Sequence, residues 1–502
     1  MSEYESEPEE AVGMDEVGAI EQDVFGGENR KWWTLAAVSL GLFMIMLDNT
    51  VVNVALPSIQ HDLGLSLSEL EWVVAGYALT FAAFMLTGGK LADLLGRRLM
   101  FVAGLVVFTA ASLACGLAGG PEVLIGARVV QGIGAALMNP ATLSIITATF
   151  PARQRGTAIG IWAGVSALAL AIGPLVGGLL SEHVDWSWIF FVNVPVGVIA
   201  IAAAYLFIDE SKDTSHGQRP DVPGLATSAV GLFALTYGLI EANSYGWGST
   251  RIIGAFAIAV VALVAFVVLE LVQRRPMLDL RLFRNGTFSG ANAAMLLVAL
   301  AMFGVFFYVS LYIQQILGYS PVQAGASFLP ATLLIAFLAP IVGKQTDRIG
   351  SRWLTGAGML LAAVSLLLFS RLDTGSSYWD ILPGLVVLGI GMALTMTPTT
   401  AAAMSSVPRD QAGVGSAVLN SMRQVGGSLG IAVTGAIVAH VSAGSLADGN
   451  PQPVAFVDGF QAGLEVAAAI AVAGAVIAVA TMRSHAKRPD VPLEEPALQE
   501  AA

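Results

Sequence analysis

The sequence is poor in charged residues and has almost no cysteine. Asp, Glu, Lys and Arg make up 12 % of its 502 residues, whereas 56 % are hydrophobic. A chain of this length with so little charge does not fit a set of soluble domains, and its composition indicates a membrane protein. The single cysteine, Cys115, excludes a disulfide framework and a cysteine metal cluster.

The acidic charge of the chain lies mostly at its N-terminus. Residues 1–30 hold ten acids and one base, Arg30, so this segment contributes −9 of the formal net charge of −12. Such a polar, Glu-rich stretch is typical of disorder, and we predict a disordered acidic tail over residues 1–32. The remaining charge of −3 gives no reason to expect nucleic acid as a partner.

Long apolar segments account for most of the chain. A helix that crosses about 30 Å of hydrocarbon needs roughly 20 mostly apolar residues. Fourteen segments meet this condition, so we predict an all-α membrane protein with fourteen transmembrane helices. The predicted spans cover residues 33–56, 72–92, 100–118, 122–143, 157–180, 187–208, 224–241, 252–271, 290–314, 322–343, 353–370, 380–403, 413–438 and 461–481.

The positions of lysine and arginine test the predicted number of spans. One missed or invented span would place every later loop on the wrong side of the membrane. With the N-terminus in the cytoplasm, 20 of the 24 lysines and arginines fall in cytoplasmic segments. Of the other four, Arg251 and Arg371 lie at outer ends, whereas Arg128 and Arg423 lie within spans. The sequence thus predicts a multi-pass protein with both termini in the cytoplasm.

Two motifs occur twice in the chain. Residues 89–98 and 343–352 share the pattern G-K-x-x-D-x-x-G-x-R at an offset of 254 residues, and residues 129–134 and 386–391 share V-V-x-G-I-G at an offset of 257. These pairs relate span 2 to span 10 and span 4 to span 12. Because both displacements are even, the two halves have the same orientation, and alternating access between rocking halves suits this symmetry best.

The repeat predicts five parts. They are a disordered acidic cytoplasmic tail (1–32), an N-terminal six-helix bundle (33–208), two inserted spans with their linkers (209–284), a C-terminal six-helix bundle (285–482) and a cytoplasmic tail (483–502). The substrate path is expected between the bundles. A monomer is sufficient for transport by such a design.

Ionisable side chains deep in a membrane cost about 2.5 to 3.5 kcal/mol on insertion scales, so each is a functional candidate. Among the acids, only Asp48 is expected well inside a span. At about 1.5 Å per residue, Asp48 lies roughly 22 Å from the inner end of span 1, and Arg128 roughly 9 Å from the outer end of span 4. The two charges can therefore share one level of the membrane.

This pair has two interpretations. Protonation of Asp48 would break the pairing with Arg128 and change the relative energy of two conformations, which describes a proton-dependent switch. Alternatively, the pair is static and only holds helices together. We favour the switch, because apolar packing can replace a purely structural pair at little loss of stability.

Polar and aromatic side chains within the spans are candidates for a substrate cavity. An aromatic cavity with one carboxylate suits hydrophobic or amphipathic cations, and the same residues admit neutral compounds. Arg423 has no acidic partner evident in the sequence. Three roles are open to it: to bind substrate, to stabilise Asp48, or to cap carbonyls where Gly426 and Gly427 loosen the helix. The candidates are Asn49, Asn53, Gln131, Asn292, Phe303, Phe307, Tyr308, Asn420 and Arg423.

These motifs resemble those of the major facilitator superfamily, in its fourteen-span drug:proton antiporter branch. Residues 47–57 (L-D-N-T-V-V-N-V-A-L-P) are similar to the span 1 motif of that branch, and residues 89–98 to the loop motif between spans 2 and 3. Residues 128–134 are similar to the span 4 motif implicated in proton coupling, and residues 173–178 to the span 5 antiporter motif. The resemblance implies the major facilitator fold, two parallel six-helix bundles with two additional central spans.

The resemblance also implies roles for individual residues. It assigns proton coupling to Asp48 and Arg128, and asymmetry between the halves is expected because Leu385 and Leu388 stand where the repeat would place Arg128 and Gln131. A cytoplasmic gate is assigned to Asp93, Arg97 and Arg98, with a second copy at Asp347 and Arg348. The antiporter motif is assigned to Gly173, Pro174, Gly177 and Gly178.

We therefore expect a secondary active transporter of the bacterial cell membrane, and no enzyme. It would export hydrophobic or amphipathic small molecules such as drugs, antibiotics or secreted metabolites, with protons, lipid and substrate as partners, the proton gradient as energy source, and no cofactor or metal. Proton-coupled uptake of a nutrient or osmolyte is the alternative. A membrane-embedded enzyme or lipid-handling scaffold is a weaker one, because the sequence lacks catalytic motifs in suitable context. The lack of carboxylates in spans 10 and 13 favours neutral or monovalent lipophilic compounds.

Overall fold

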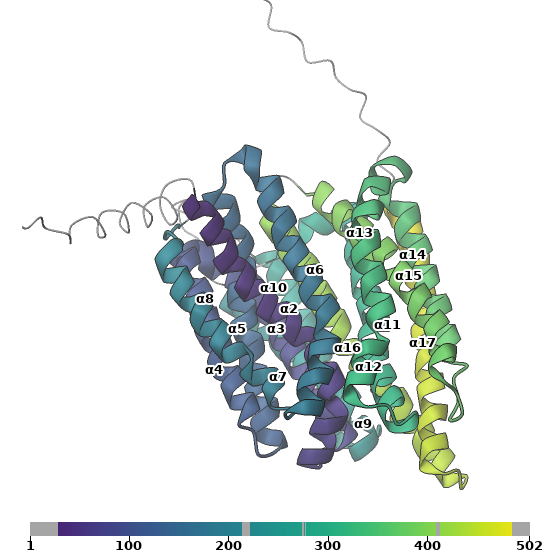
Figure 1. The fold of residues 1–502 in the computed structure, drawn as a ribbon. Coiled ribbons are helices and arrows are strands. Elements are labelled where there is room, and N and C mark those ends of the chain that lie inside the picture. Colours follow the sequence, from purple (N-terminus) through teal and green to yellow (C-terminus); the bar gives the residue numbers. More distant parts are fainter. Residues whose placement is uncertain (1–28, 213–220, 274–275, 277, 408–411, 484–502) are drawn as a thin grey trace, which may run out of the picture.

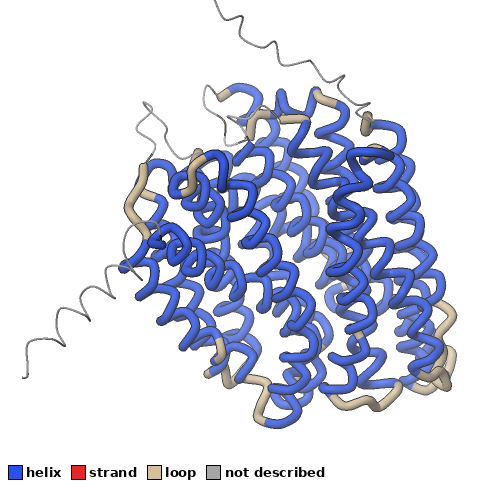
Figure 2. Tube along the Cα trace, turned by 45° about the horizontal axis from the view of Figure 1, so that its top comes forward, coloured by secondary structure: helices blue, strands red, loops and turns tan. Residues whose placement is uncertain are grey.

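The computed structural model describes residues 29–212, 221–273, 276, 278–407 and 412–483. All regular elements among these residues are helical, as predicted (Figure 2). Thirteen helices are long and apolar enough to cross a membrane, and the bent helix α6 (Ala152–His183) brings the number to 14. The predicted acidic tail, apart from its last residues, and nearly all of the C-terminal tail lie outside the described residues.

The helices form two bundles that stand side by side (Figure 1). The first contains α2 (Arg30–Leu63), α3 (Leu67–Leu95), α4 (Arg97–Gly116), α5 (Pro121–Thr149), α6, α7 (Trp188–Phe191) and α8 (Asn193–Phe207). The second contains α11 (Gly286–Leu311), α12 (Pro321–Ser327), α13 (Leu329–Ile349), α14 (Ser351–Phe369), α15 (Tyr378–Ser405), α16 (Ala412–Ala447) and α17 (Gln452–Thr481). Between them in sequence are α9 (Val222–Tyr245) and α10 (Thr250–Val272).

Three predicted spans are interrupted or bent. The span expected at residues 187–208 consists of α7 and α8, and the one at 322–343 consists of α12 and α13. Within α6, the segments Thr157–Leu170 and Ile172–His183 meet at an angle of 40°. Pro174 follows this bend, and a proline has no N–H for the carbonyl four residues earlier, which is the usual cause of a kink.

The structure extends the internal repeat beyond its motifs. Two features recur at the offset of 254 residues. A glycine with positive φ follows the preceding helix, at Gly64 (φ 65°) and at Gly318 (φ 71°). Capping boxes begin the next helix at Ser66 and Ser320. Each half therefore enters its second span through the same turn.

Close packing explains why two glycines recur in α5 and α15. A Cβ on Gly132 would meet α3, and one on Gly389 would meet α13. A Cβ on Gly134 would lie 2.6 Å from the backbone N of Phe108 in α4, while Gly391 packs in the same way against α14. Small residues let helix backbones approach each other where lipid leaves little hydrophobic drive for association.

The two halves meet chiefly along four helix pairs, α2 with α11, α6 with α12, α6 with α13, and α3 with α16. The last pair we call the α3–α16 seam. Helix α9 packs against both helices of this seam. Helix α9 therefore covers one side of the boundary between the halves, which makes the otherwise repeated structure asymmetric.

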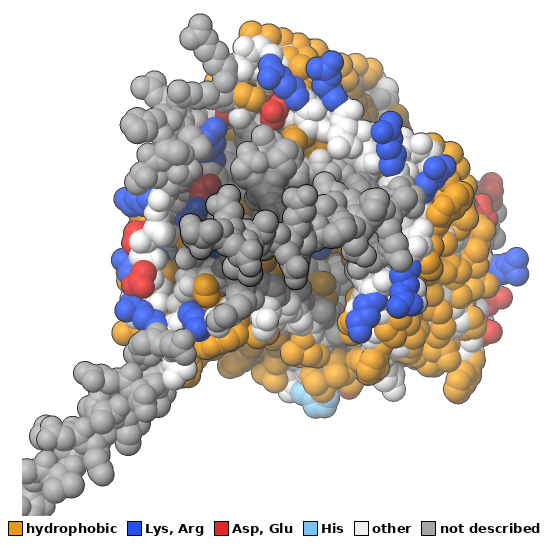
Figure 3. Space-filling model, turned by 90° about the horizontal axis from the view of Figure 1, so that it is seen from above, with side chains coloured by type: hydrophobic (Ala, Val, Ile, Leu, Met, Phe, Trp, Pro, Cys, Tyr) orange, Lys and Arg blue, Asp and Glu red, His pale blue; other side chains and the backbone are white. Residues whose placement is uncertain are grey.

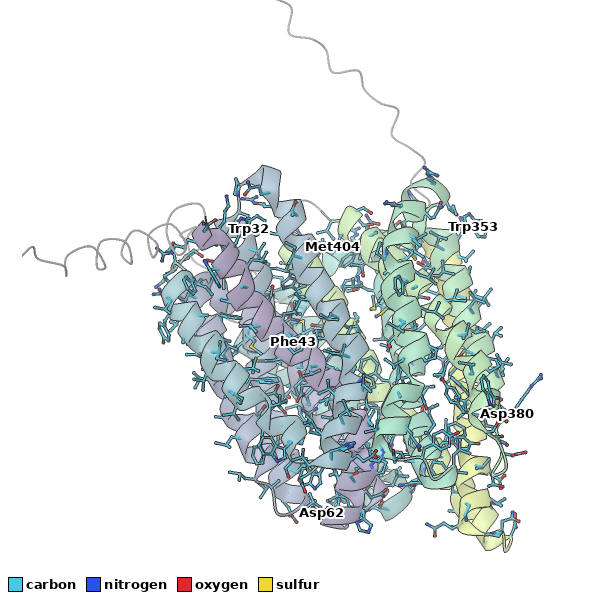
Figure 4. All side chains as sticks on the ribbon, in the orientation of Figure 1. Trp32, Phe43, Asp62, Trp353, Asp380 and Met404 are labelled. Carbon is cyan, nitrogen blue, oxygen red and sulfur yellow. The ribbon has the colours of Figure 1, made fainter. Side chains whose placement is uncertain are left out.

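Arginine side chains gather at one end of the bundles. Arg30 begins α2, Arg97 begins α4, and Arg483 follows α17. Figure 3 shows lysine and arginine around the rim of this face, and Figure 4 places Trp32, Trp353 and Met404 near it. We call it the basic end, and the end that carries Asp62 the opposite end (Figure 4).

Hydrogen bonds join the halves near the opposite end. The carbonyl of Asn53 accepts a hydrogen bond from the Ser310 hydroxyl at 2.9 Å, and Gln315 donates to Gln60 at 2.7 Å. The carboxylate of Glu182 accepts one from the backbone N–H of Val322 at 2.9 Å. These contacts hold the opposite end closed.

The glycine contacts yield a test of the packing. Gly134→Val should lower the free energy of unfolding by about 1–3 kcal/mol, because the new side chain meets the backbone of α4 and the helices must separate. Thermal unfolding of the purified protein in detergent measures this effect. Gly126→Val is the matched control on the same helix, since nothing lies within 4 Å of its added Cβ. Equal unfolding temperatures for the two variants would contradict this account of the packing.

Candidate functional site

A buried ion pair links α2 to α5. Arg128 Nη1 lies 2.5 Å from Asp48 Oδ2, and each residue is 1 % exposed. The depth estimate from the sequence places both charges at one level, and here they are in direct contact. Both residues belong to the N-terminal half, so the pair does not itself join the two halves.

Further hydrogen bonds complete the network around this pair. Gln131 accepts a hydrogen bond from Arg128 Nη1 at 2.6 Å and donates to Asp48 Oδ1 at 2.9 Å. Arg128 Nε also donates to the carbonyl of Val73 at 3.0 Å, and Gln131 donates to the Ser112 hydroxyl at 2.7 Å. Both carboxylate oxygens of Asp48 are thus occupied, and the ionised form of Asp48 is the one that this network stabilises.

Aromatic rings cover the guanidinium group. Its central carbon lies 4.3 Å from the ring centroid of Tyr77 and 5.7 Å from that of Phe190. Both rings are buried. They exclude water and offer the cation a favourable π face, but they supply no negative charge. If Asp48 took up a proton, Arg128 would remain as a buried cation without an opposite charge.

The C-terminal half provides an internal comparison for this site. The repeat places Leu385 and Leu388 at the positions of Arg128 and Gln131, and both leucines are buried. The offset of 254 residues places Met302 opposite Asp48, and Met302 is buried as well. The same helix arrangement therefore forms with apolar residues at these three positions, which argues against a purely structural need for the ion pair.

Gln131 lies in this network, although the sequence analysis assigned it to the substrate cavity. It is fully buried. Residues three apart share one face of a helix, so the spacing of Arg128 and Gln131 is the signal that would have placed them together.

The other amides predicted for the cavity do not converge on one site. Each donates to a backbone carbonyl four residues earlier in its own helix, as seen for Asn49, Asn53, Asn292 and Asn420. Among the aromatic candidates, Phe303 contacts Gly427, while Phe307 and Tyr308 are buried in edge-to-face contact at 4.9 Å.

Arg423 differs from the other candidates because it is a charge without a partner. It lies 11 residues into α16, about 16 Å along the helix, and is partly exposed. Among the described residues it forms no ion pair, and its Nε has no hydrogen-bond partner. Its electrostatic neighbour is Tyr77, the residue whose ring also covers Arg128.

The residues assigned to the cytoplasmic gate lie at the basic end. Arg97 Nη2 pairs with Asp93 at 3.1 Å, and Arg98 donates to the carbonyl of Ile208 at 3.1 Å. The carboxylate of Glu210 accepts hydrogen bonds from the backbone N–H groups of Arg98 and Leu99. These groups form the N-terminus of α4, where the helix dipole favours a negative charge. In the second copy, Arg348 is exposed and the side chain of Asp347 lies outside the described residues.

The glycines of the antiporter motif are contact points for other helices. Gly173 and Gly177 face Thr50 and Val51 of α2, and Gly178 faces the backbone of Pro321 in the other half. This motif therefore brings α6 close both to the helix that carries Asp48 and to the boundary between the halves.

Glu71 is a buried acid that the sequence did not indicate. Asp48 was the single acid expected well inside a span, because the second span was expected to begin at residue 72. The helix begins at Leu67, and Glu71 lies in its second turn with 3 % exposure. The capping box of Ser66 and Glu69 is the signal that would have moved the start of the helix back.

Comparisons with known proteins agree with this architecture. The family model of the Major Facilitator Superfamily matches residues 38–431. The tetracenomycin C resistance and export protein of Streptomyces glaucescens is 38 % identical over 84 % of this chain and 78 % of its own. The puromycin resistance protein of Streptomyces alboniger is 37 % identical over 89 % of this chain and 90 % of its own.

Solved structures agree on the fold. The inward-facing bacterial homologue of the human lysosomal transporter Spinster has a TM-score of 0.64 at 19 % identity, covering 91 % of this chain and 97 % of its own. The peptide transporter PepTSo has a TM-score of 0.66 at 16 % identity, covering 91 % and 98 %. This chain is a multi-pass membrane transporter and not an enzyme, and it belongs to the Major Facilitator Superfamily.

Proposed function

We propose that this protein exports hydrophobic or amphipathic small molecules from a bacterial cell and that inward movement of protons drives the export. The network of Asp48, Arg128 and Gln131 is the observation that carries this proposal. It is a titratable pair inside the membrane, in a position where the repeat of the same fold has apolar residues. The named functions of the relatives, antibiotic resistance and export, support the direction.

The proposed coupling step is protonation of Asp48. Leaving one partner of a buried ion pair uncompensated costs roughly 3–5 kcal/mol. About 5.5 kcal/mol shifts a two-state equilibrium from 1:99 to 99:1. A single proton at Asp48 would therefore supply most of the energy that a change of conformation requires, and Arg128 would favour the conformation in which it reaches another acceptor or water.

We further propose that the basic end faces the cytoplasm, as the distribution of lysine and arginine favours. The closed contacts at the opposite end then correspond to a state whose outer side is closed. Uptake by proton symport uses the same scaffold, and only the direction of coupled flux separates it from export.

Asp48→Asn should abolish efflux against a gradient. Asparagine keeps the shape of the side chain but cannot alternate between an ionised and a protonated form. The measurement is efflux of puromycin and of a lipophilic fluorescent cation from energised cells, with and without a proton uncoupler. We expect native efflux to be lost on addition of uncoupler and to be absent in the variant.

Asp448→Asn is the control for this experiment, since Asp448 is exposed at the end of α16. The amount of each variant in the membrane is measured in parallel. Uphill efflux by Asp48→Asn would rule out Asp48 as the coupling site, and accumulation by energised cells expressing the native protein would favour uptake.

The unpaired charge of Arg423 also bears on the substrate. A guanidinium group without an acidic partner favours a ligand with a carboxylate, phenolate or other strong acceptor. We propose that Arg423 contacts such a group of the exported compound, since the Asp48–Arg128 pair contributes no net charge to the interior.

Arg423→Gln should therefore discriminate between substrates by charge. Loss of a charge-assisted hydrogen bond worth about 1.5–3 kcal/mol raises the KM for a fluorescent lipophilic anion by about tenfold or more. The KM for a cation of similar size should stay the same or fall. Arg371→Gln, at an exposed position, is the control; equal effects of Arg423→Gln on anion and cation would contradict the assignment.

A further inference from the structure

The α3–α16 seam contains a buried carboxylate that the network around Asp48 does not use. Glu71 of α3 is 3 % exposed. Tyr308 of α11, which is fully buried, donates a hydrogen bond to Glu71 Oε1 at 2.6 Å. Gly435 of α16 faces the same carboxyl group. Glu71 therefore connects the N-terminal half to two helices of the C-terminal half.

No cation among the described residues balances this carboxylate, because Glu71 takes part in none of their ion pairs. The titratable groups that face it are Tyr308 from α11 and Glu241 from α9, and Gly435 adds none from α16. An ionised carboxylate that is buried with one neutral donor is unfavourable, whereas a protonated acid is tolerated in such a place. The closed seam thus suits a Glu71 that carries a proton.

Helix α9 covers Glu71 from the remaining side. Trp72, the next residue of α3, donates to Glu241 at 3.2 Å, and Asn243 donates to the carbonyl of Ala436 in α16 at 2.9 Å. Arg251, at the start of α10, stacks on the rings of Tyr237 and Tyr245 in α9 and does not pair with Glu71. The inserted helix therefore encloses the carboxyl group without neutralising it.

The repeat argues against a structural need for this acid. The offset of 254 residues that relates Ser66 to Ser320 places Gly325 at the position of Glu71. Gly325 packs against the backbone of Pro174 in α6. The equivalent contact between the halves, that of α12 with α6, is thus made by a glycine and needs no carboxylate. A carboxylate at Glu71 must therefore serve a purpose other than closure itself.

From this geometry we propose that Glu71 is a second proton-binding site, which must take up a proton from the opposite end before the α3–α16 seam can close. Glu71 lies about 7 Å along α3 from the cap at Ser66, so it reaches water when the halves separate at that end. Ionised Glu71 keeps the seam open, and protonated Glu71 packs against Tyr308 and Gly435. The site rests on the proposed proton-driven export and deepens it, because it makes the return to the closed state depend on an external proton.

A distance measurement between the halves tests this site. Spin labels are placed at Glu122 and Asp448, which are exposed at the opposite end of the N-terminal and C-terminal halves. Electron–electron double resonance on the full-length protein in lipid nanodiscs then gives the separation from acidic to alkaline pH. In the native sequence we expect the longer distance to gain population as the pH rises. Glu71→Gln should show the short distance at every pH.

Two further variants make the outcome specific to Glu71. Glu241→Gln, one contact away, should keep a response of the distance to pH, and singly labelled proteins report any label at buried Cys115. A native distance that does not change with pH, or a Glu71→Gln protein that keeps the native response, would overturn the proposal. If the response disappears in Asp48→Asn and persists in Glu71→Gln, the proton site at Glu71 is wrong while coupling through Asp48 stands.

Discussion

An ionised side chain inside a membrane protein needs either an opposite charge or a proton, because little water is available to solvate it. Asp48 and Arg128 each provide the opposite charge that the other needs. Both oxygens of the Asp48 carboxylate also accept hydrogen bonds. Glu71 has only a tyrosine hydroxyl, and Arg423 has no acidic partner among the described residues. Neither Glu71 nor Arg423 therefore has an opposite charge among the described residues, and the ligands proposed for them are a proton and an anionic group of the substrate.

The second constraint is the approach of helix backbones. Recurring glycines give both halves the same internal packing, as with Gly134 against α4 and Gly391 against α14. On this common framework the polar residues are distributed unequally, since the C-terminal half has leucines where the N-terminal half has Arg128 and Gln131. Helix α9 adds to this asymmetry. It covers the α3–α16 seam and, within the described part of the chain, none of the other main helix pairs between the halves. In the proposed function, the symmetric packing serves a rocking motion of the two halves, and the unequal charges confine the proton response of Asp48 to the N-terminal half.

The sequence predicted those features that depend on local pattern. Apolar length predicted the helices, and counting residues along two spans predicted that Asp48 and Arg128 reach the same level. Contacts between distant segments could not be predicted in this way. The bond between Glu71 and Tyr308 joins residues 237 apart, and the four amides expected in the cavity bind carbonyls of their own helices instead. Which face of each helix meets a neighbour is decided by packing that a single sequence does not display.

In the proposed mechanism, Asp48 alternates between an ionised, paired form and a protonated form. Infrared difference spectroscopy of the purified protein, recorded between acidic and alkaline pH in H₂O and in D₂O, observes the carbonyl stretch of a protonated carboxylic acid directly. We expect a band of this kind that grows as the pH falls, shifts in D₂O and is missing from the Asp48→Asn spectrum. Identical difference spectra for native protein and Asp48→Asn would mean that Asp48 holds no exchangeable proton over this range, and would rule out its proposed role.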